Sequence, residues 1–157
     1  MHLEGSCAAK ARADGFVLPP HDPHHYGHNT YKLDDHVLDP DRPEYLMYYG
    51  HEGKLYLTGM MFIPRTREEQ GLQIGGPLTL WHYHTWRRAQ CTTDELIPRG
   101  WASKDGRCEE SIPKYRSPEM IHVWLIDRNE GPFTTSMIIP PEELKTGLEK
   151  RLAERGY

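Results

Sequence analysis

The pattern of apolar and polar residues is clearest between residues 45 and 64, where it predicts a β-hairpin. Two apolar runs, 45–49 and 55–64, flank a short polar turn that contains two glycines. Runs rich in aromatic and aliphatic residues, joined by a turn of this kind, are typical of paired antiparallel strands. We therefore expect these residues to form two neighbouring strands of a sheet.

Two further segments, 78–86 and 120–127, are predicted to be strands that carry histidines among their apolar residues. Successive side chains of a strand point to opposite faces, so every second residue shares a face. The predicted faces carry Leu80, His82, His84 and Trp86 on the first strand, and Met120, His122, Trp124 and Ile126 on the second. After a turn at 129–132, a short strand is expected near 136–139.

Three other segments lack a regular period. Residues 1–18 indicate a loose N-terminal arm, and the many prolines of 19–43 exclude a helix and favour an extended, wrapped loop. The segment 91–118 has glycine, proline and charged residues at short intervals. An excursion of that length is unusual in a compact domain unless it covers something, so it is expected to be a lid or the wall of a site.

The last segment, 140–156, is predicted to be a helix that packs on the sheet. It opens with two prolines and two glutamates, which suit the positive end of a helix, and it places Leu144, Leu148 and Leu152 on one face. The whole chain, 1–157, has the length of one domain. The expected fold class is therefore mainly β, a small β-barrel or sandwich with a C-terminal helix.

Charge and composition exclude several classes of partner. The formal net charge is −4 and the basic residues are scattered, so nothing predicts the basic face that nucleic acid or an anionic membrane requires. No apolar run is long enough to cross a bilayer, and the first residues lack the pattern of a secretory leader. We expect no nucleic-acid or membrane partner and a cytoplasmic location, with export by a leader outside this sequence as the alternative.

The three cysteines, Cys7, Cys91 and Cys108, are an odd number, which leaves at least one thiol free. Two interpretations of Cys91 stay open. It pairs with Cys108 if the protein is exported, or it supplies a thiolate to a metal, which would favour Zn or Cu.

Ten histidines in a chain of this length point to metal or proton chemistry. His82 and His84 are candidate ligands because residues i and i+2 of a strand point the same way. His122 is the candidate third ligand, since an imidazole inside an apolar strand needs a polar partner. The alternative for His122 is a core histidine hydrogen-bonded to a backbone carbonyl.

A second group of histidines lies within residues 21–28, where a proline and a glycine predict a loop. From this group we nominate His25 as a ligand that closes the site from above. The alternative is that His21, His24, His25 and His28 all belong to a solvated polar loop.

The stretch from Gly76 to His84 resembles the opening of the first cupin motif, which is a glycine, five residues and then His-x-His. The resemblance implies a small β-barrel in which His82 and His84 bind Fe, Mn, Zn, Cu or Ni, with His122 as the histidine of the second motif. The family's glutamate falls at position 88 or 89, where this chain has arginine and alanine, and the second motif lacks its glycine and asparagine. The resemblance therefore implies at most a three-histidine variant of that metal geometry.

Aromatic residues near the histidines predict an apolar pocket for a small organic molecule, which we assign to Trp86 and Trp124. Arg88 is a candidate partner for a carboxylate on that molecule. The alternatives are that the tryptophans fill the core and that the arginine is a solvated charge at a strand end.

Together these features predict a metalloprotein with one transition-metal ion, Fe, Zn or Cu, held by His82, His84, His122 and His25. The first hypothesis is an enzyme, an oxidoreductase or isomerase of the cupin type, acting on a small molecule. The alternatives are a metal-binding or metal-sensing module without turnover, and a structural or interaction domain with incidental histidines. A homodimer formed through exposed strand edges also stays open.

Overall fold

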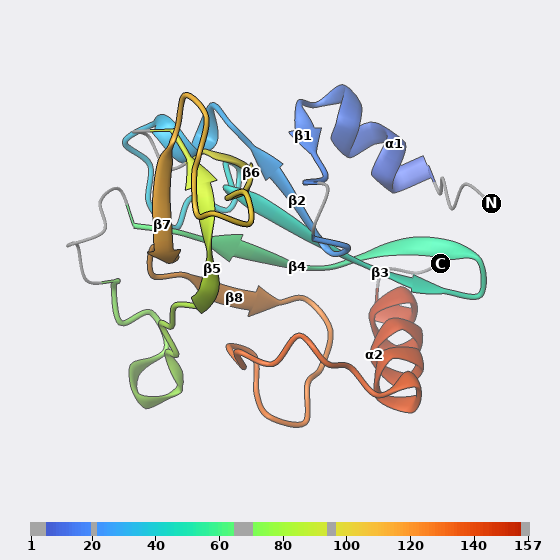
Figure 1. The fold of residues 1–157 in the computed structure, drawn as a ribbon. Coiled ribbons are helices and arrows are strands. Elements are labelled where there is room, and N and C mark those ends of the chain that lie inside the picture. Colours follow the sequence, from blue (N-terminus) through green and yellow to red (C-terminus); the bar gives the residue numbers. More distant parts are fainter. Residues whose placement is uncertain (1–5, 20–21, 65–70, 94–96, 155–157) are drawn as a thin grey trace.

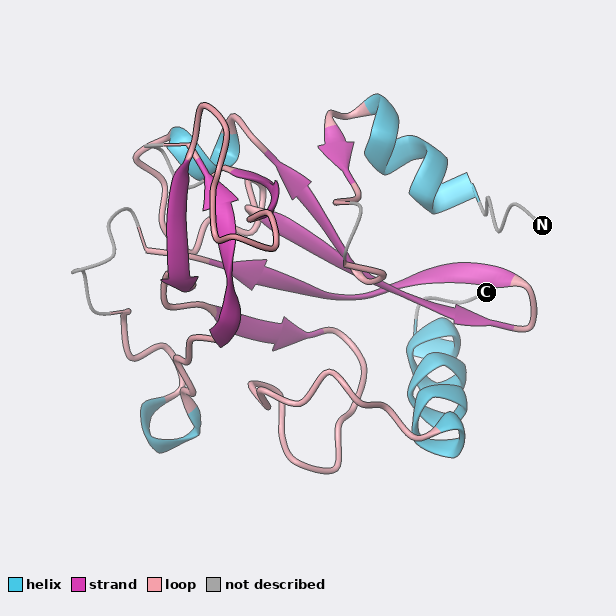
Figure 2. Cartoon of the chain, in the orientation of Figure 1, coloured by secondary structure: helices cyan, strands magenta, loops and turns pink. Residues whose placement is uncertain are grey.

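The computed structural model describes residues 6–19, 22–64, 71–93 and 97–154, which form two antiparallel sheets and two α-helices (Figures 1 and 2). The larger sheet has the strand order β1-β2-β3-β4-β8, and the smaller has the order β6-β5-β7. The strands are β1 (Phe16–Val17), β2 (His25–His28), β3 (Tyr45–His51), β4 (Lys54–Phe62), β5 (Thr85–Thr92), β6 (Pro98–Trp101), β7 (Ile112–Arg116) and β8 (Ile121–Trp124). The helices are α1 (Ser6–Ala13) and α2 (Pro141–Glu154), and two short 3-10 helices lie at Tyr31–Leu33 and Gly76–Leu78.

The mainly β fold with a C-terminal helix is therefore confirmed. Within the described residues, neither strand order returns to its own first strand, so the barrel or sandwich arrangement stays a prediction.

The hairpin of β3 and β4 is the longest strand pair and confirms the prediction for residues 45–64. Its strands pair from Tyr45 opposite Met61 to His51 opposite Lys54. The two turn residues, Glu52 and Gly53, have φ angles of 48° and 76°. Positive φ at both central residues is the geometry that a two-residue hairpin turn requires.

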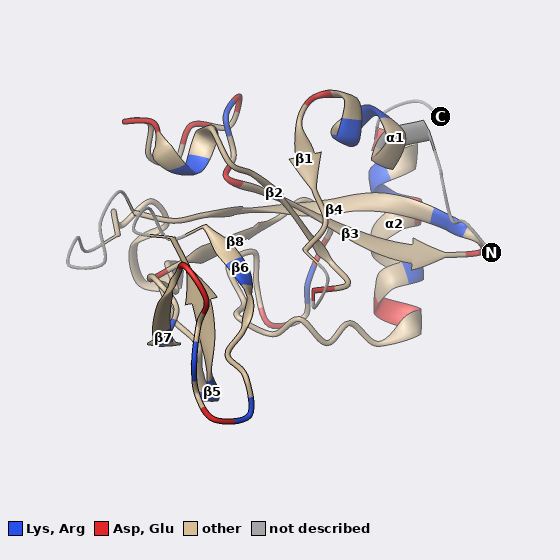
Figure 3. Cartoon of the chain, turned by 45° about the horizontal axis from the view of Figure 1, so that its top comes forward, with Lys and Arg blue, Asp and Glu red and all other residues tan. Residues whose placement is uncertain are grey.

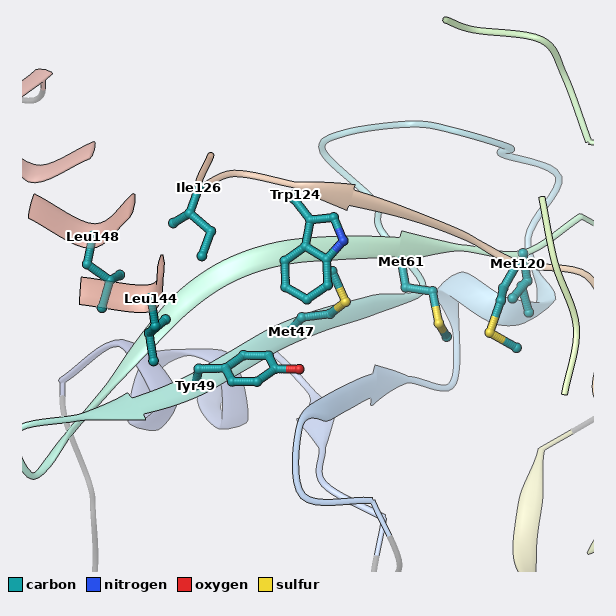
Figure 4. Close-up of a cluster of buried hydrophobic side chains, with 9 residues drawn as sticks. Met47, Tyr49, Met61, Met120, Trp124, Ile126, Leu144 and Leu148 are labelled. Carbon is teal, nitrogen blue, oxygen red and sulfur yellow. The ribbon is translucent and has the colours of Figure 1, made fainter. Parts of the chain in front are cut away.

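Side chains from opposite faces of β3 build separate cores on the two sides of the larger sheet. Met47 and Tyr49 pack with residues of β4, β8 and α2 in a cluster that Figure 4 shows. Tyr48 points the other way and packs with Tyr26 and with the alanines of α1. The two helices therefore cover opposite faces of the sheet, and the prediction that α2 packs its leucines on it is confirmed for Leu144 and Leu148.

A buried arginine holds the segment after β8 against α2. The side chain of Arg128 is 1% exposed, and its Nε donates to Glu143 Oε1 at 2.8 Å. Its other nitrogens donate to the carbonyls of Ser136 and Ile138. These bonds keep residues 136–139 as an irregular loop, so the strand predicted there is wrong.

The N-terminal part is more regular than predicted. Residues 6–17 form α1 and β1 instead of a loose arm, and His25–His28 form β2 instead of a loop. β2 lies between β1 and β3 in the sheet, where Gly27 pairs with Tyr45. Pairing with β3 thus overrides the local proline and glycine signals.

The strand predicted at 78–86 is shifted along the chain. Residues 76–78 form a 3-10 helix, and regular pairing begins only at Thr85. The expected excursion at 91–118 contains β6 and β7, which pair with the two sides of β5. This smaller sheet forms one wall of a cavity described below, as the site-wall interpretation predicted.

Cys91 and Cys108 form a disulfide that joins β5 to the loop between β6 and β7. The interpretation of Cys91 as a metal-binding thiolate is therefore wrong, because its sulfur is already bonded. Figure 3 shows acidic and basic residues interspersed along the described chain. None of the described helices is long and apolar enough to cross a membrane.

Removing the disulfide is expected to lower the free energy of unfolding by about 3 kcal/mol, because it closes a loop whose ends are 17 residues apart. Urea unfolding of Cys91→Ser, Cys108→Ser and the double variant measures this. Once one cysteine is replaced, the second replacement should cost little. Additive losses, or three free thiols in the denatured wild-type protein, would contradict the bond.

Candidate histidine site between the sheets

Four histidines from three segments of the chain converge where the two sheets meet. His122 on β8 is central, with ring centroids 4.7 Å from His82 and 5.6 Å from His25. The ring of His84 lies 5.2 Å from that of His82. The structure thus brings together the four residues predicted from the sequence as metal ligands.

His122 is the most buried of these histidines, with 0% of its surface exposed. Neither of its ring nitrogens has a hydrogen-bond partner in the described structure. Desolvation, with the neighbouring His25 and His82, lowers its pKa to about 3. The nearby backbone of Thr134 raises the pKa somewhat, but it does not meet the geometry of a hydrogen bond to the ring. The imidazole is therefore neutral at physiological pH, and its buried unpaired nitrogens are a cost to the fold.

His25 is oriented by a carboxylate. Asp22 Oδ2 lies 2.7 Å from His25 Nδ1, and Asp22 Oδ1 accepts the backbone N–H groups of His24 and His25 at 2.9 Å each. Although burial opposes it, these interactions lower the pKa of Asp22 to about 2, so the carboxylate is ionised. If His25 is neutral and donates from Nδ1–H to Asp22, Nε2 keeps its lone pair, and this nitrogen is buried without a partner in the described structure.

His82 and His84 are held by backbone bonds to the segment that leads into β8. His82 exchanges two backbone hydrogen bonds with Met120, and the His84 carbonyl accepts from the N–H of Ser117. His82 Nε2 is buried and unpaired, while the His84 side chain is exposed. Partial desolvation and a neighbouring histidine lower the pKa of both imidazoles.

A cavity of about 280 Å³ opens beside His25 and His84. One wall comes from the larger sheet and contributes Tyr45, Met61 and Ile63. The other comes from the smaller sheet, where Trp86 and Trp101 meet edge to face at 5.6 Å. The site therefore combines buried imidazoles with an adjacent space that has mostly apolar walls.

The three residues assigned from sequence to a substrate pocket have different positions. Trp86 lines the cavity. Trp124 belongs to the core, where its Nε1 donates to the Thr134 carbonyl, and Arg88 donates to the Ala102 carbonyl. Neither Trp124 nor Arg88 is among the described residues that line the cavity.

The other described histidines of segment 21–28 make contacts outside this group. His24 stacks on Tyr49 and His28 stacks on Tyr31, whereas His21 lies outside the described residues. Sequence reasoning missed Asp22 as the partner of His25. The sequence feature that could have indicated this pair is the spacing Asp-x-x-His, because a turn of three residues can place the carboxylate of Asp22 beside the imidazole of His25.

Within the described part of the chain, no group of three or more His, Cys, Asp or Glu side chains has the geometry to hold a metal ion as it stands. No protein-family model matches the sequence, and neither a curated protein nor a solved structure matches it. The resemblance to the cupin motif thus stays a prediction.

The buried imidazole of His122 predicts acid sensitivity of the metal-free protein. Its pKa is about 3 in the folded state against an ordinary 6.5, so the unfolded chain takes up a proton that the folded chain does not. Its contribution to stability is complete above pH 6.5 and falls away between about 6.5 and 3. Urea unfolding with EDTA across this range is expected to show a flatter profile for His122→Leu. The matched variant His51→Leu, at the end of the hairpin, should keep the wild-type slope, and equal slopes in all three proteins would refute the assignment.

Proposed function

We propose that this chain is a histidine-ligated metalloenzyme that binds one Fe, Zn or Cu ion between its sheets. The observation that supports this proposal is that imidazole nitrogens of His25, His82 and His122 are buried without hydrogen bonds. Transition metals bind neutral imidazole nitrogen, so an ion would supply the partner that these atoms lack. The lowered pKa values of His82 and His122 favour the neutral form that a ligand must have.

The spacing of the rings is compatible with a shared ion. Two imidazoles bonded to one tetrahedral ion have ring centroids about 5 Å apart, because each metal–nitrogen bond is about 2 Å long. The centroid distances from His122 to His82 and to His25 are 4.7 and 5.6 Å. The proposal requires the rings to turn about their Cβ–Cγ bonds so that one nitrogen of each faces a common centre.

Asp22 has a positioning role in this proposal. Its carboxylate accepts a hydrogen bond from His25 Nδ1–H and directs Nε2 toward the centre of the site. Carboxylates that orient a ligating histidine in this way are common around protein metal sites.

The cavity favours an enzyme over a closed structural site. With His25, His82 and His122 as ligands, a tetrahedral ion would keep a fourth position, and the cavity lined by His25 and His84 would give a substrate access to it. A bound ion would there act as a Lewis acid or activate oxygen, which fits an isomerase or oxidoreductase of small molecules.

A second candidate function is metal storage or sensing without turnover. The observation that favours it is the 5.2 Å distance between the rings of His84 and His82, which lets His84 serve as a fourth protein ligand. A site filled by four histidines has no open position for a substrate.

The disulfide between Cys91 and Cys108 indicates in which cellular compartment the protein works. Disulfides persist in oxidising environments and are rare in the cytoplasm. The bond between Cys91 and Cys108 therefore favours the export alternative over the cytoplasmic location expected from the sequence. We propose that the protein works in an oxidising compartment.

Elemental analysis of untagged protein is expected to find about one Fe, Zn or Cu ion per chain in the wild type and none in the double variant His82→Ala/His84→Ala. The matched control is His36→Ala/His51→Ala, which removes the same number of imidazoles outside the site and should keep its metal. Adding the ion to metal-free wild-type protein should raise the free energy of unfolding, by about 2.7 kcal/mol at 100 times Kd. A wild type that is empty and cannot be loaded, or equal metal loss in both double variants, would refute the proposal.

A further inference from the structure

We propose that the cavity beside the histidines binds a small aromatic carboxylate with a single ring, its carboxylate held by Thr92 and Arg99 and its far end directed toward His25 and His84. The inference deepens the proposed function by naming a substrate class, and it rests on that function only for the reaction. Binding of the carboxylate itself needs the cavity and not the ion.

The Thr92 end of the cavity has a polar group that lacks a partner. Thr92 is 2% exposed, and its Oγ1 is buried without a hydrogen bond in the described structure. A buried hydroxyl without a partner costs free energy, which a ligand oxygen would recover. Because Thr92 lines the cavity, the proposal places an acceptor atom of the ligand beside this residue.

The neighbouring strand β6 adds an arginine to the lining of the cavity. Pro98 of β6 pairs with Thr92, and the following residue, Arg99, also lines the cavity. Arg99 is exposed, its side chain has no hydrogen bond or ion pair among the described residues, and it also borders a second, more open hollow beside the disulfide. A guanidinium with a neighbouring hydroxyl donor suits a carboxylate, which accepts at both oxygens.

The part of the cavity near His25 and His84 carries an acidic residue instead of a basic one. Among the described residues that line the cavity, the acidic one is Asp22, and both of its oxygens already accept hydrogen bonds from His24 and His25. A ligand anion would therefore avoid this end and favour the Arg99 end. A neutral or metal-binding oxygen on the far side of the ligand suits the imidazoles.

The apolar part of the lining suits a ring. Trp86 and Trp101 meet edge to face at an interplanar angle of 89°, and Met61 and Met120 add to the apolar lining. Aromatic rings and thioethers both pack favourably against an aromatic ligand. The volume of about 280 Å³ lies just below the range of drug-sized sites, which favours one ring over two.

The test uses benzoate as the probe, titrated into metal-free and metal-loaded protein by calorimetry and by tryptophan fluorescence. We expect saturable binding of benzoate to both forms, and weaker binding of benzyl alcohol, which lacks the charge, and of acetate, which lacks the ring. Arg99→Gln is expected to weaken benzoate binding about tenfold or more, as is typical for loss of a hydrogen bond to a charged group. Thr92→Val, which keeps the shape and removes the hydroxyl, should weaken it in the same direction.

The matched control is Arg87→Gln, an exposed arginine of β5 that does not line the cavity and should bind benzoate as the wild type does. Absence of benzoate binding, equal binding of acetate, or equal effects of Arg99→Gln and Arg87→Gln would each overturn the proposal. Metal content is measured on the same samples. Benzoate binding without metal uptake would refute the proposed function and leave this inference standing. Metal uptake without benzoate binding would do the reverse.

Discussion

Burial of the imidazole of His122 is the constraint around which the site is organised. The side chain is 0% exposed and neither ring nitrogen has a hydrogen bond in the described structure, a costly state for a polar group. The register of β4 and β8 places His122 opposite Met61, next to the largest core cluster, so the imidazole cannot reach solvent without disrupting that pairing. The adjacent His25 and His82 do not donate to or accept from this ring, and each adds a buried unpaired nitrogen of its own.

The surrounding fold fixes this arrangement from three directions. Backbone bonds between His82 and Met120 bring the segment before β5 beside β8, and the pairing of β2 with β3 brings His25 to the same place. On the third side, Arg128 anchors the loop after β8, whose Thr134 carbonyl accepts from Trp124. The smaller sheet then faces the larger one across the cavity, so that the histidines lie at its edge.

Local patterns predicted the hairpin, the face of β8 and the helix α2, because each depends on residues close together in the chain. They also indicated the four histidines, because the His-x-His of residues 82–84, the apolar surroundings of His122 and the cluster that contains His25 are visible in the sequence. They failed for α1, β2 and the start of β5, whose structure depends on partners far along the chain. Thr92 and Arg99 could not be found in this way, because their significance comes from the unpaired hydroxyl and the pairing of β5 with β6.

The central claim is that the buried nitrogens share one ion, and anomalous diffraction from crystals of the metal-loaded protein tests it most directly. The account predicts one strong peak about 2 Å from a nitrogen of each of His25, His82 and His122, the usual length of a metal–imidazole bond. It also predicts that Asp22 remains hydrogen-bonded to His25 Nδ1 in that structure. A peak located on other histidines, or no peak between the sheets at full loading, would contradict the account.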